Sequence, residues 1–348
     1  MKFKPNSEAV FSEEPVTFVN VLDHIKLSGT LSMPMEGKNV PCVILISGSG
    51  PQTRDQHVAG HKIFKDISDR LASNGIAVLR FDDRGVGDSE GVFETAGLLD
   101  FRNDVIAAID YLTHYRRDTI HSIGVLGHSL GGLVAPMVEN IADGRVAFVI
   151  SLAGPGMRGS EIYREQHLLI AKEQGMADTE LELMDETNRK ICELVININE
   201  EKALMQAFKD IMLSEHRDKT FFKRKFSQLR ARLLFIVSKK QINLYNHPWF
   251  KDWLMLEPEK YWSNVRCPTL VVNGQLDVQC PAKNVDLIKA YIESGGNREA
   301  SVKLFSDHNH LFQRVKDRDR DMLNYKKIKS SISNEATDYI TSWIRHLV

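Results

Sequence analysis

Short apolar runs recur along the chain, and between them the apolar residues fall at helical spacing. The run at 41–46 is apolar throughout, which suits a strand buried on both faces of a parallel sheet. Two β-like runs precede it at 16–20 and 25–33, and the second alternates as a half-exposed strand does. Five later runs have a similar character: 76–81, 123–126, 146–152, 269–272 and, more weakly, 302–305.

Helical spacing is clearest soon after the run at 41–46. Ile63, Ile67 and Leu71 are four residues apart, as on one face of a helix. Similar helical patterns are found in three later segments: 105–112, 288–292 and 339–347. Strands that alternate with helices predict a mostly parallel sheet with right-handed crossovers and helices on both faces. We therefore expect an α/β fold with an eight-stranded sheet.

The alternation is interrupted once, between two predicted strands. It stops after residue 156 and resumes near residue 264. The intervening stretch, 157–263, is rich in Leu, Ile, Met, Glu and Lys and has few glycines, which favours helices. We interpret 157–263 as an inserted helical cap or lid, and 1–156 with 264–348 as the core that it interrupts.

Composition narrows the class of protein without identifying it. The 348 residues include 45 Lys and Arg against 46 Asp and Glu, and a net charge of −1 argues against a nucleic-acid-binding protein. No apolar run is long enough to span a membrane, and the first residues lack the apolar core of a secretion signal. We expect a cytoplasmic protein, although a mature chain whose leader had been removed would look the same. The four cysteines lie far apart, which is typical of free thiols in a reducing compartment or of incidental core residues.

One segment departs from the even charge balance. Residues 217–240 include nine Lys and Arg and a single acid, Asp218. Two interpretations stay open for this segment. It is either a solvated helix face or a collar that attracts anionic substrates or a membrane surface.

The segment 127–131 carries the strongest chemical signal in the chain. Its sequence is Gly-His-Ser-Leu-Gly, directly after the apolar run 123–126 and directly before a helical run. So tight a turn from strand to helix strains its central residue, Ser129, and glycines at Gly127 and Gly131 avoid side-chain collisions. The alternative is a glycine-rich turn that holds nothing, or a phosphate. Since the helix N-terminus favours an anion, we predict that Ser129 is a nucleophile.

Three further motifs match the α/β-hydrolase superfamily, whose nucleophile elbow often has the sequence Gly-His-Ser-x-Gly. They are Ser-Gly-Ser-Gly-Pro at 47–51, Arg-Phe-Asp-Asp-Arg-Gly-Val-Gly-Asp-Ser at 80–89, and Asn-His-Leu-Phe at 309–312. With these motifs the chain resembles the lid-bearing serine esterase and aminopeptidase-like branch, which is related to the dienelactone hydrolases. The resemblance covers residues 16–156 and 264–347 and implies the α/β-hydrolase fold.

The resemblance also implies the partners of Ser129. A serine hydroxyl needs an adjacent base, and His310 matches the histidine of the family's Asn-His motif, with His308 as the alternative. The family's Gly-x-x-Asp pattern places the acid that orients this imidazole at Asp277, with Asp307 in reserve. The chain order Ser, Asp, His is the order expected of this fold.

The oxyanion that forms during acyl transfer needs preorganised N–H donors. One donor should be the backbone N–H of Leu130, directly after the nucleophile. The other should come from the loop after the third strand, for which we predict the backbone of Ser49, with Gly50 as runner-up. Ser47 stands where many relatives carry a histidine that braces this loop, so we expect a change in the support of the loop rather than in the chemistry.

Several other polar residues invite a functional role that we do not assign. We interpret the charged motif at 80–84 as an ion-paired loop beneath the elbow. We expect Arg54 to be an ion-paired structural residue as well, and the alternative is that it binds an acidic substrate. We expect His128 to be a packing or hydrogen-bonded histidine.

Two histidine pairs have metal-like spacing, His57-x3-His61 and His308-x-His310. Neither has the glutamate of a His-Glu-x-x-His helix or a clear third ligand. We therefore expect no metal site, and the acyl-enzyme mechanism expected of Ser129, His310 and Asp277 needs no cofactor.

These residues together predict a serine hydrolase that cleaves carboxylic esters of short-to-medium acyl length through an acyl-enzyme. A serine aminopeptidase or amidase is the alternative, for which acids at 178–182 could grip a substrate amine. A binding protein that kept the fold without the chemistry is a further alternative. The expected partner is a small-molecule ester, without nucleic acid and without a membrane span.

Overall fold

The computed structural model describes residues 10–35, 39–214, 243–316 and 322–348 of the chain. Contacts within these residues divide the chain into two compact units. Unit 1 comprises Met1–Phe93, Leu99–Met157 and Glu257–Val348, and unit 2 comprises Glu94–Leu98 and Arg158–Leu256.

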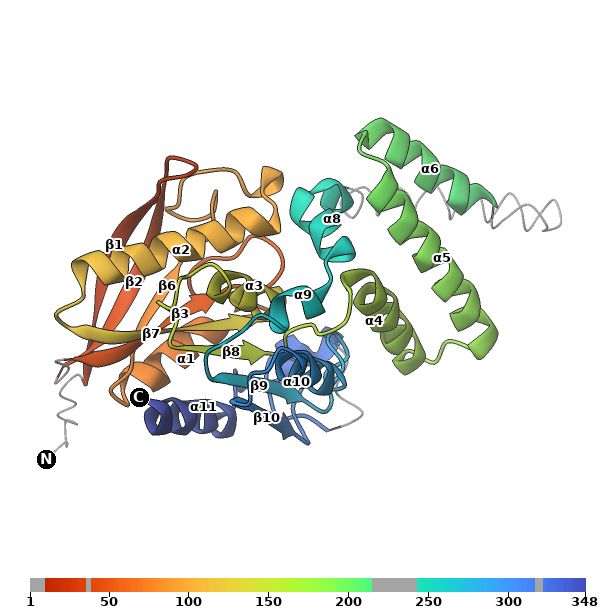
Figure 1. Ribbon diagram of the computed structural model, residues 1–348. Coiled ribbons are helices and arrows are strands. Elements are labelled where there is room, and N and C mark those ends of the chain that lie inside the picture. The colour runs from red at the N-terminus through yellow and green to blue at the C-terminus, as the bar shows by residue number, and fades with distance from the viewer. Residues whose placement is uncertain (1–9, 36–38, 215–242, 317–321) are drawn as a thin grey trace, which may run out of the picture. The chain divides into compact units, whose positions relative to one another are not determined.

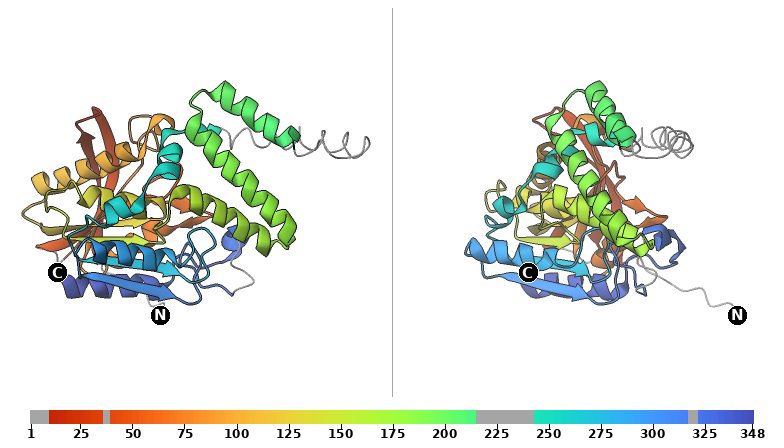
Figure 2. Two further views of the ribbon diagram at one scale, coloured as in Figure 1. Left: turned by 45° about the vertical axis from the view of Figure 1, so that its right-hand side comes forward. Right: turned by 90° about the vertical axis from the view of Figure 1, so that its right-hand side faces the viewer.

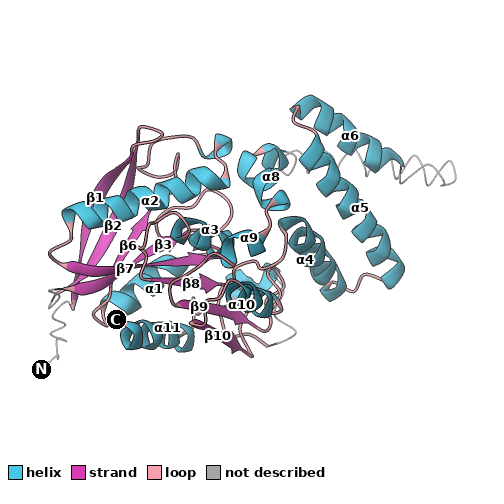
Figure 3. Ribbon diagram, in the orientation of Figure 1, coloured by secondary structure: helices cyan, strands magenta, loops and turns pink. Residues whose placement is uncertain are grey.

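Unit 1 contains one eight-stranded sheet, drawn in magenta in Figure 3. Its strands are β1 (Phe11–Asn20), β2 (Ile25–Pro34), β3 (Val40–Ile46), β6 (Ala77–Phe81), β7 (Ile120–His128), β8 (Phe148–Leu152), β9 (Thr269–Gly274) and β10 (Ala300–Phe305). Their order across the sheet is β1-β2-β6-β3-β7-β8-β9-β10. The β1–β2 and β2–β6 pairs are antiparallel and the others are parallel. The predicted eight-stranded, mostly parallel sheet is confirmed.

Helices of unit 1 cover both faces of this sheet (Figure 1). Helices α1 (Ile63–Ala72) and α11 (Asn334–Leu347) contact each other and share one apolar core cluster with the strands. The residues whose spacing predicted α1, namely Ile63, Ile67 and Leu71, all lie in that cluster. Unit 1 also contains α3 (Leu130–Glu139), α9 (Pro258–Trp262), α10 (Asn284–Ser294) and the 3₁₀ helix η3 (Met322–Lys327). Helix α2 (Leu98–Tyr115) belongs to it apart from its first residue, and the 3₁₀ helix η1 (Phe93–Thr95) belongs to it only at Phe93.

The parallel strands end at the same edge of the sheet, and this arrangement positions the candidate site. The loop after β3 contains a small hairpin of β4 (His57–Val58) and β5 (His61–Lys62). Strand β7 ends at His128, directly before Ser129, and the loops after β9 and β10 carry Asp277 and His310. In open parallel sheets, ligands bind beyond the carboxyl ends of the strands.

The described residues of unit 2 form helices. This unit contains α4 (Gly159–Glu173), α5 (Asp178–Asn197), α6 (Glu201–Ser214) and α8 (Pro248–Met255). Helix α5 packs against α4 and α6, and α8 packs on α4 and α5 (Figure 2). The buried phenol oxygens of Tyr163 and Tyr245 lie 2.6 Å apart. The basic segment at 217–240 lies outside the described residues.

The four cysteines are free, which confirms the prediction of free thiols. Burial raises the pKa of the Cys42 thiol to about 12, so this side chain behaves as a small apolar core residue. No helix in the described ranges combines the length and the apolar character needed to cross a bilayer.

Candidate active site

Ser129 sits in a strained turn between β7 and α3. Its backbone has φ 54° and ψ −120°, a left-handed conformation that is costly for a residue with a side chain. The Ser129 N–H donates to the carbonyl of Leu152 at 2.9 Å, which ties the turn to the end of β8. Ser129 is partly exposed, whereas its neighbours His128 and Leu130 are buried. The strained turn therefore leaves the Ser129 side chain accessible at this edge of the sheet.

The glycines of this turn are required by close backbone contacts. A Cβ on Gly127 would lie 2.0 Å from the carbonyl oxygen of Gly131. A Cβ on Gly131 would lie 2.1 Å from the carbonyl oxygen of Ile46 and 2.5 Å from that of Ser47. The elbow thus packs directly on the end of β3, where the candidate oxyanion loop begins.

His310 and Asp277 form a buried pair. The Nδ1–H of His310 donates to Asp277 Oδ2 at 2.7 Å, and both side chains are almost fully buried. The other oxygen, Asp277 Oδ1, accepts the backbone N–H groups of Gln279 at 2.7 Å and Cys280 at 2.9 Å. These bonds fix the carboxylate, and the Asp277 contact engages Nδ1 of His310 rather than Nε2.

The alternative base and acid have other partners. His308 Nε2 lies 2.7 Å from Ser333 Oγ, and its Nδ1 lies 2.9 Å from Asp307 Oδ1. Burial lowers the pKa of His308. The second oxygen of Asp307 is paired with Arg314 at 3.0 Å. Asp307 and His308 therefore belong to a separate cluster.

That cluster also includes the one group of potential metal ligands found among the described residues, Asp307, His308 and Glu335. Arg314 contacts both of its carboxylates. A cation placed there would meet this guanidinium, so the donor set fits an ion-pair cluster better than a metal site. In the other pair with metal-like spacing, His57 and His61, the Nε2 atom of His61 forms a hydrogen bond with the backbone carbonyl of Tyr325 at 3.1 Å.

His128 connects the elbow with two other loops. Gln56 Nε2 donates to its Nδ1 at 2.6 Å, and its Nε2–H donates to the backbone carbonyl of His310 at 2.9 Å. Its ring packs on that of His310 with 4.9 Å between centroids. Burial, and then the nearby His310, lower the pKa of His128 to about 3, so it stays neutral. The interpretation of His128 as a hydrogen-bonded histidine is confirmed.

The structure thus joins His310 to Asp277, and it brings His310 to the elbow through His128. Within the described part of the chain, no hydrogen bond joins Ser129 Oγ to His310 Nε2. Gln56, which links the loop after β3 to this arrangement, was missed by the sequence analysis. No motif marks Gln56, because its role depends on contacts between residues that are distant in the chain.

The loop after β3 lies over the elbow. A Cβ on Gly48 would be 3.3 Å from Ser129 Cβ and 3.3 Å from the carbonyl oxygen of His128. Ser49 is exposed, and Gly50 has φ 85°. Leu130, the other predicted donor residue, is buried at the N-terminus of α3.

The charged motif after β6 is ion-paired at Asp82 and Arg84, as predicted, whereas Asp83 has hydrogen-bond partners instead. Asp82 accepts the backbone N–H of Arg54 at 2.7 Å and is paired with its guanidinium. Arg84 is paired with Asp104 at 2.8 Å. Since Arg54 belongs to the loop after β3, the motif braces that loop.

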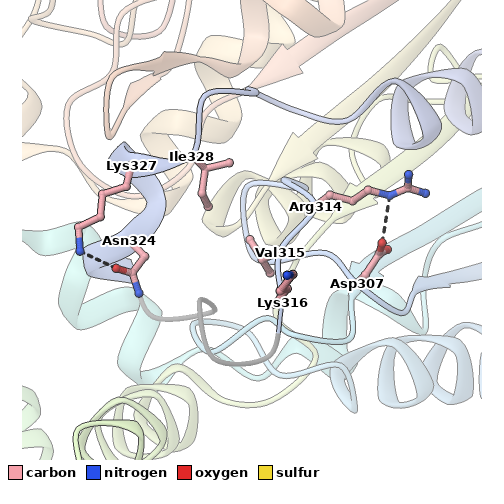
Figure 4. Close-up of a pocket in the computed structure, with 7 residues that line it drawn as sticks. All are labelled: Asp307, Arg314, Val315, Lys316, Asn324, Lys327 and Ile328. Atoms are coloured by element: carbon pink, nitrogen blue, oxygen red, sulfur yellow. Dashed lines mark hydrogen bonds and ion pairs between the residues drawn. The ribbon is translucent and has the colours of Figure 1, made fainter.

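Figure 4 shows a hollow of about 570 Å³ in unit 1, lined by Asp307, Arg314, Val315, Lys316, Asn324, Lys327 and Ile328. Ser129, Asp277 and His310 are not among its lining residues. A small cavity of about 20 Å³ lies beside the elbow and has a mainly apolar wall. Its lining comprises Ile46, Ser47, Gly48, Phe81, Asp83, Phe93, Phe101, Asp104, Val105, Leu130 and Val134.

Comparison by sequence relates most of the chain to one family. Residues 23–311 match the family described as X-Pro dipeptidyl-peptidase (S15 family). The esterase EstD of Thermotoga maritima is 30% identical over 167 residues, which are 47% of this chain and 39% of EstD. The match thus spans well under half the length of EstD.

Comparison by structure shows the fold. The esterase Pf2001 of Pyrococcus furiosus has a TM-score of 0.60 at 14% identity, over 100% of this chain and 95% of its own. The α/β hydrolase GrgF of Penicillium sp. sh18 has a TM-score of 0.56 at 16% identity, over 97% and 98%. Est1E of Butyrivibrio proteoclasticus, solved with ferulic acid, has a TM-score of 0.55 at 17% identity, over 95% and 99%. The fold is that of the α/β hydrolases.

Proposed function

Because the chain belongs to the X-Pro dipeptidyl-peptidase (S15) family and has the α/β-hydrolase fold, we propose that it is a serine hydrolase of carboxylic esters with short-to-medium acyl chains. The observation that carries the proposal is the buried His310–Asp277 pair at 2.7 Å, on the sheet edge where the strained turn presents Ser129. The esterase names of EstD, Pf2001 and Est1E support an ester as the substrate.

The proposed reaction has two steps. Ser129 Oγ attacks the ester carbonyl carbon while His310 Nε2 takes the hydroxyl proton. The tetrahedral intermediate then expels the alcohol, which receives this proton from His310. Water attacks the resulting acyl-enzyme in the same way and releases the carboxylic acid and free Ser129. Asp277 holds the Nδ1–H of His310 and stabilises the imidazolium that forms in each step.

The oxyanion of both intermediates needs donors that are in place beforehand. We assign this role to the backbone N–H of Leu130 and to that of Ser49, with Gly50 as runner-up. One such donor lowers the barrier by about 3 kcal/mol in well-studied hydrolases. The N-terminus of α3 adds a favourable dipole at the same place. We assign residues 157–263 to a cap that selects the substrate.

A serine peptidase is the second candidate, and the S15 family match favours it. A peptidase of this kind needs acids that grip the free amine of its substrate. The suspected acids begin α5, where Glu180 Oε2 accepts the backbone N–H of Ala177 at 3.2 Å and so caps the helix. Since this acid already has a structural partner, we place the ester first.

The test compares p-nitrophenyl esters of increasing acyl length with aminoacyl- and X-Pro-nitroanilides, for the wild type and Ser129→Ala. We expect ester hydrolysis by the wild type and a loss of about 10³-fold or more in Ser129→Ala, since the nucleophile is gone. Hydrolysis that survives in Ser129→Ala would contradict the mechanism. Faster anilide than ester cleavage would favour the peptidase.

A further inference from the structure

The loop after β3 is held at two points by one carboxyl group, that of Asp83. The hydroxyl of Ser47 donates to Asp83 Oδ1 at 2.6 Å, and the backbone N–H of Gln52 donates to Asp83 Oδ2 at 2.9 Å. In return, the backbone N–H of Asp83 donates to the carbonyl of Gln52 at 3.0 Å. The two points enclose Ser49 and Gly50, the candidate oxyanion donors.

Little else within this loop fixes its conformation. Its first five residues, 47–51, have the sequence Ser-Gly-Ser-Gly-Pro with two glycines, and Gly50 has a positive φ of 85°. Glycine gives a chain the freedom to adopt many conformations. Inside the loop, the Gln52 side chain donates to the Ser49 carbonyl at 3.3 Å, a long hydrogen bond. The position of the loop over Ser129 therefore depends on outside contacts.

The surroundings of Asp83 disfavour the ionised form of its carboxyl group, because burial removes the charge from water. Asp83 also lines the cavity of about 20 Å³ that borders Gly48 and Leu130. The charges of Asp82 and Asp104 act on it, and these two carboxylates are paired with Arg54 and Arg84. Desolvation is the main cause that raises the pKa of Asp83 to about 7, and the charges of Asp104 and Asp82 raise it further.

We propose that Asp83 is a positioning residue for the oxyanion hole, which holds the loop at Ser47 and Gln52 so that a backbone N–H points to the oxyanion on Ser129. The inference rests on the proposed function. In this chain, the hydrogen bonds of Asp83 to Ser47 and Gln52 supply this support of the loop. Oxyanion donors act only when held close to their productive position, and a misplacement of about 1 Å costs roughly 100-fold in rate.

The test measures kcat and KM for ester hydrolysis by three variants. Asp83→Ala removes both hydrogen bonds, and Ser47→Ala removes one of them without disturbing a carboxyl group. Asp83→Asn is the conservative variant, because its amide oxygen can accept from Gln52 while its NH₂ group donates to Ser47 Oγ. Ser68→Ala is the matched control, since it removes a buried hydrogen bond of 2.9 Å to Ser32, away from the loop.

If Asp83 positions the oxyanion donor, the variants should change kcat and keep KM within about twofold of the wild-type value. The reason is that the oxyanion exists only in the transition state and the intermediates. We expect kcat to fall about 10- to 100-fold in Asp83→Ala and less in Ser47→Ala. Asp83→Asn should recover most of the loss, and Ser68→Ala should retain the wild-type kcat. Rates are expressed per active site, counted with a fluorophosphonate, so that misfolded protein does not contribute.

The outcomes separate this inference from the proposed function. If the wild type hydrolyses esters through Ser129 while Asp83→Ala and Ser47→Ala keep its kcat, the positioning role is overturned and the function stands. A fall in Ser68→Ala equal to that in Ser47→Ala would also overturn it, since the loss would then be general. A wild type without Ser129-dependent hydrolysis would overturn the function, and this inference with it.

Discussion

His128 shows how much of the site depends on a residue that takes no part in the chemistry. It is only 2% exposed, and both ring nitrogens have partners, on Gln56 and on the backbone of His310. These two bonds fix its tautomer, with the proton on Nε2. Three loops are thereby connected through one neutral imidazole.

The lowered pKa of His128 predicts how stability changes with pH. An unfolded histidine titrates near pH 6.5, whereas burial lowers the pKa of folded His128 to about 3. The unfolded state therefore binds more protons between these values, so His128 stabilises the fold above pH 6.5 and loses this contribution as pH falls towards 3.

The measurement is urea unfolding of the wild type and His128→Gln from pH 4 to 8. The wild type should be the more stable protein at pH 7 to 8, and its advantage should shrink steadily below about pH 6.5. An advantage that stays constant over this range would mean that His128 is not held neutral by burial.

The residues of the site differed in how far the sequence could predict them. Asp277 and His310 follow predicted strands and match short motifs, so both could be proposed in advance, and the structure joins them. Asp83 and Gln56 could not, because their roles depend on partners that are near only after folding. Asp83 was assigned with its neighbours to an ion-paired loop, which holds for Asp82 and Arg84 but not for its own contacts.

At the scale of elements, the apolar runs predicted strands best where both faces are buried. β6, β8 and β9 are buried at every position. β1 begins at Phe11 rather than at residue 16, because its first half is a mostly exposed edge that pairs only with β2 and shows no apolar alternation. The hairpin of β4 and β5 was missed, since two-residue strands leave no periodic pattern.

The contact between the elbow and the end of β3 gives a prediction for Gly131→Ala. The new Cβ would lie 2.1 Å from the Ile46 carbonyl oxygen and 2.5 Å from that of Ser47, so α3 and the loop after β3 must move apart. We expect a loss of roughly 1–3 kcal/mol in the free energy of unfolding. The displaced loop should lower kcat at least about 10-fold.

Gly296→Ala serves as the control for this substitution. Gly296 has a positive φ of 91°, but no atom lies within 4 Å of a Cβ built there. It should therefore lose some stability from backbone strain and keep the wild-type kcat. Wild-type kcat in Gly131→Ala would mean that the elbow and the loop are not coupled through this contact.

At the scale of the whole molecule, the sequences of the two units differ in how much they indicate about function. Unit 1 has the α/β-hydrolase fold and the candidate site, and both could be inferred from local sequence. Unit 2 is helical in its described residues, but its sequence has no motif that identifies a substrate. The S15 family match and the esterase relatives point to different acyl substrates, and the choice between ester and peptide depends on the substrate assays proposed for this chain.

The most direct test of the central claim is the site of covalent labelling by a fluorophosphonate, located by mass spectrometry of peptides. The proposed mechanism predicts one label on Ser129, with labelling slowed at least about 100-fold in His310→Ala because the base is missing. Asp277→Asn should also label slowly, since His310 would lose the partner of its Nδ1–H. A label on another residue, or wild-type labelling of Ser129 in His310→Ala, would contradict the account.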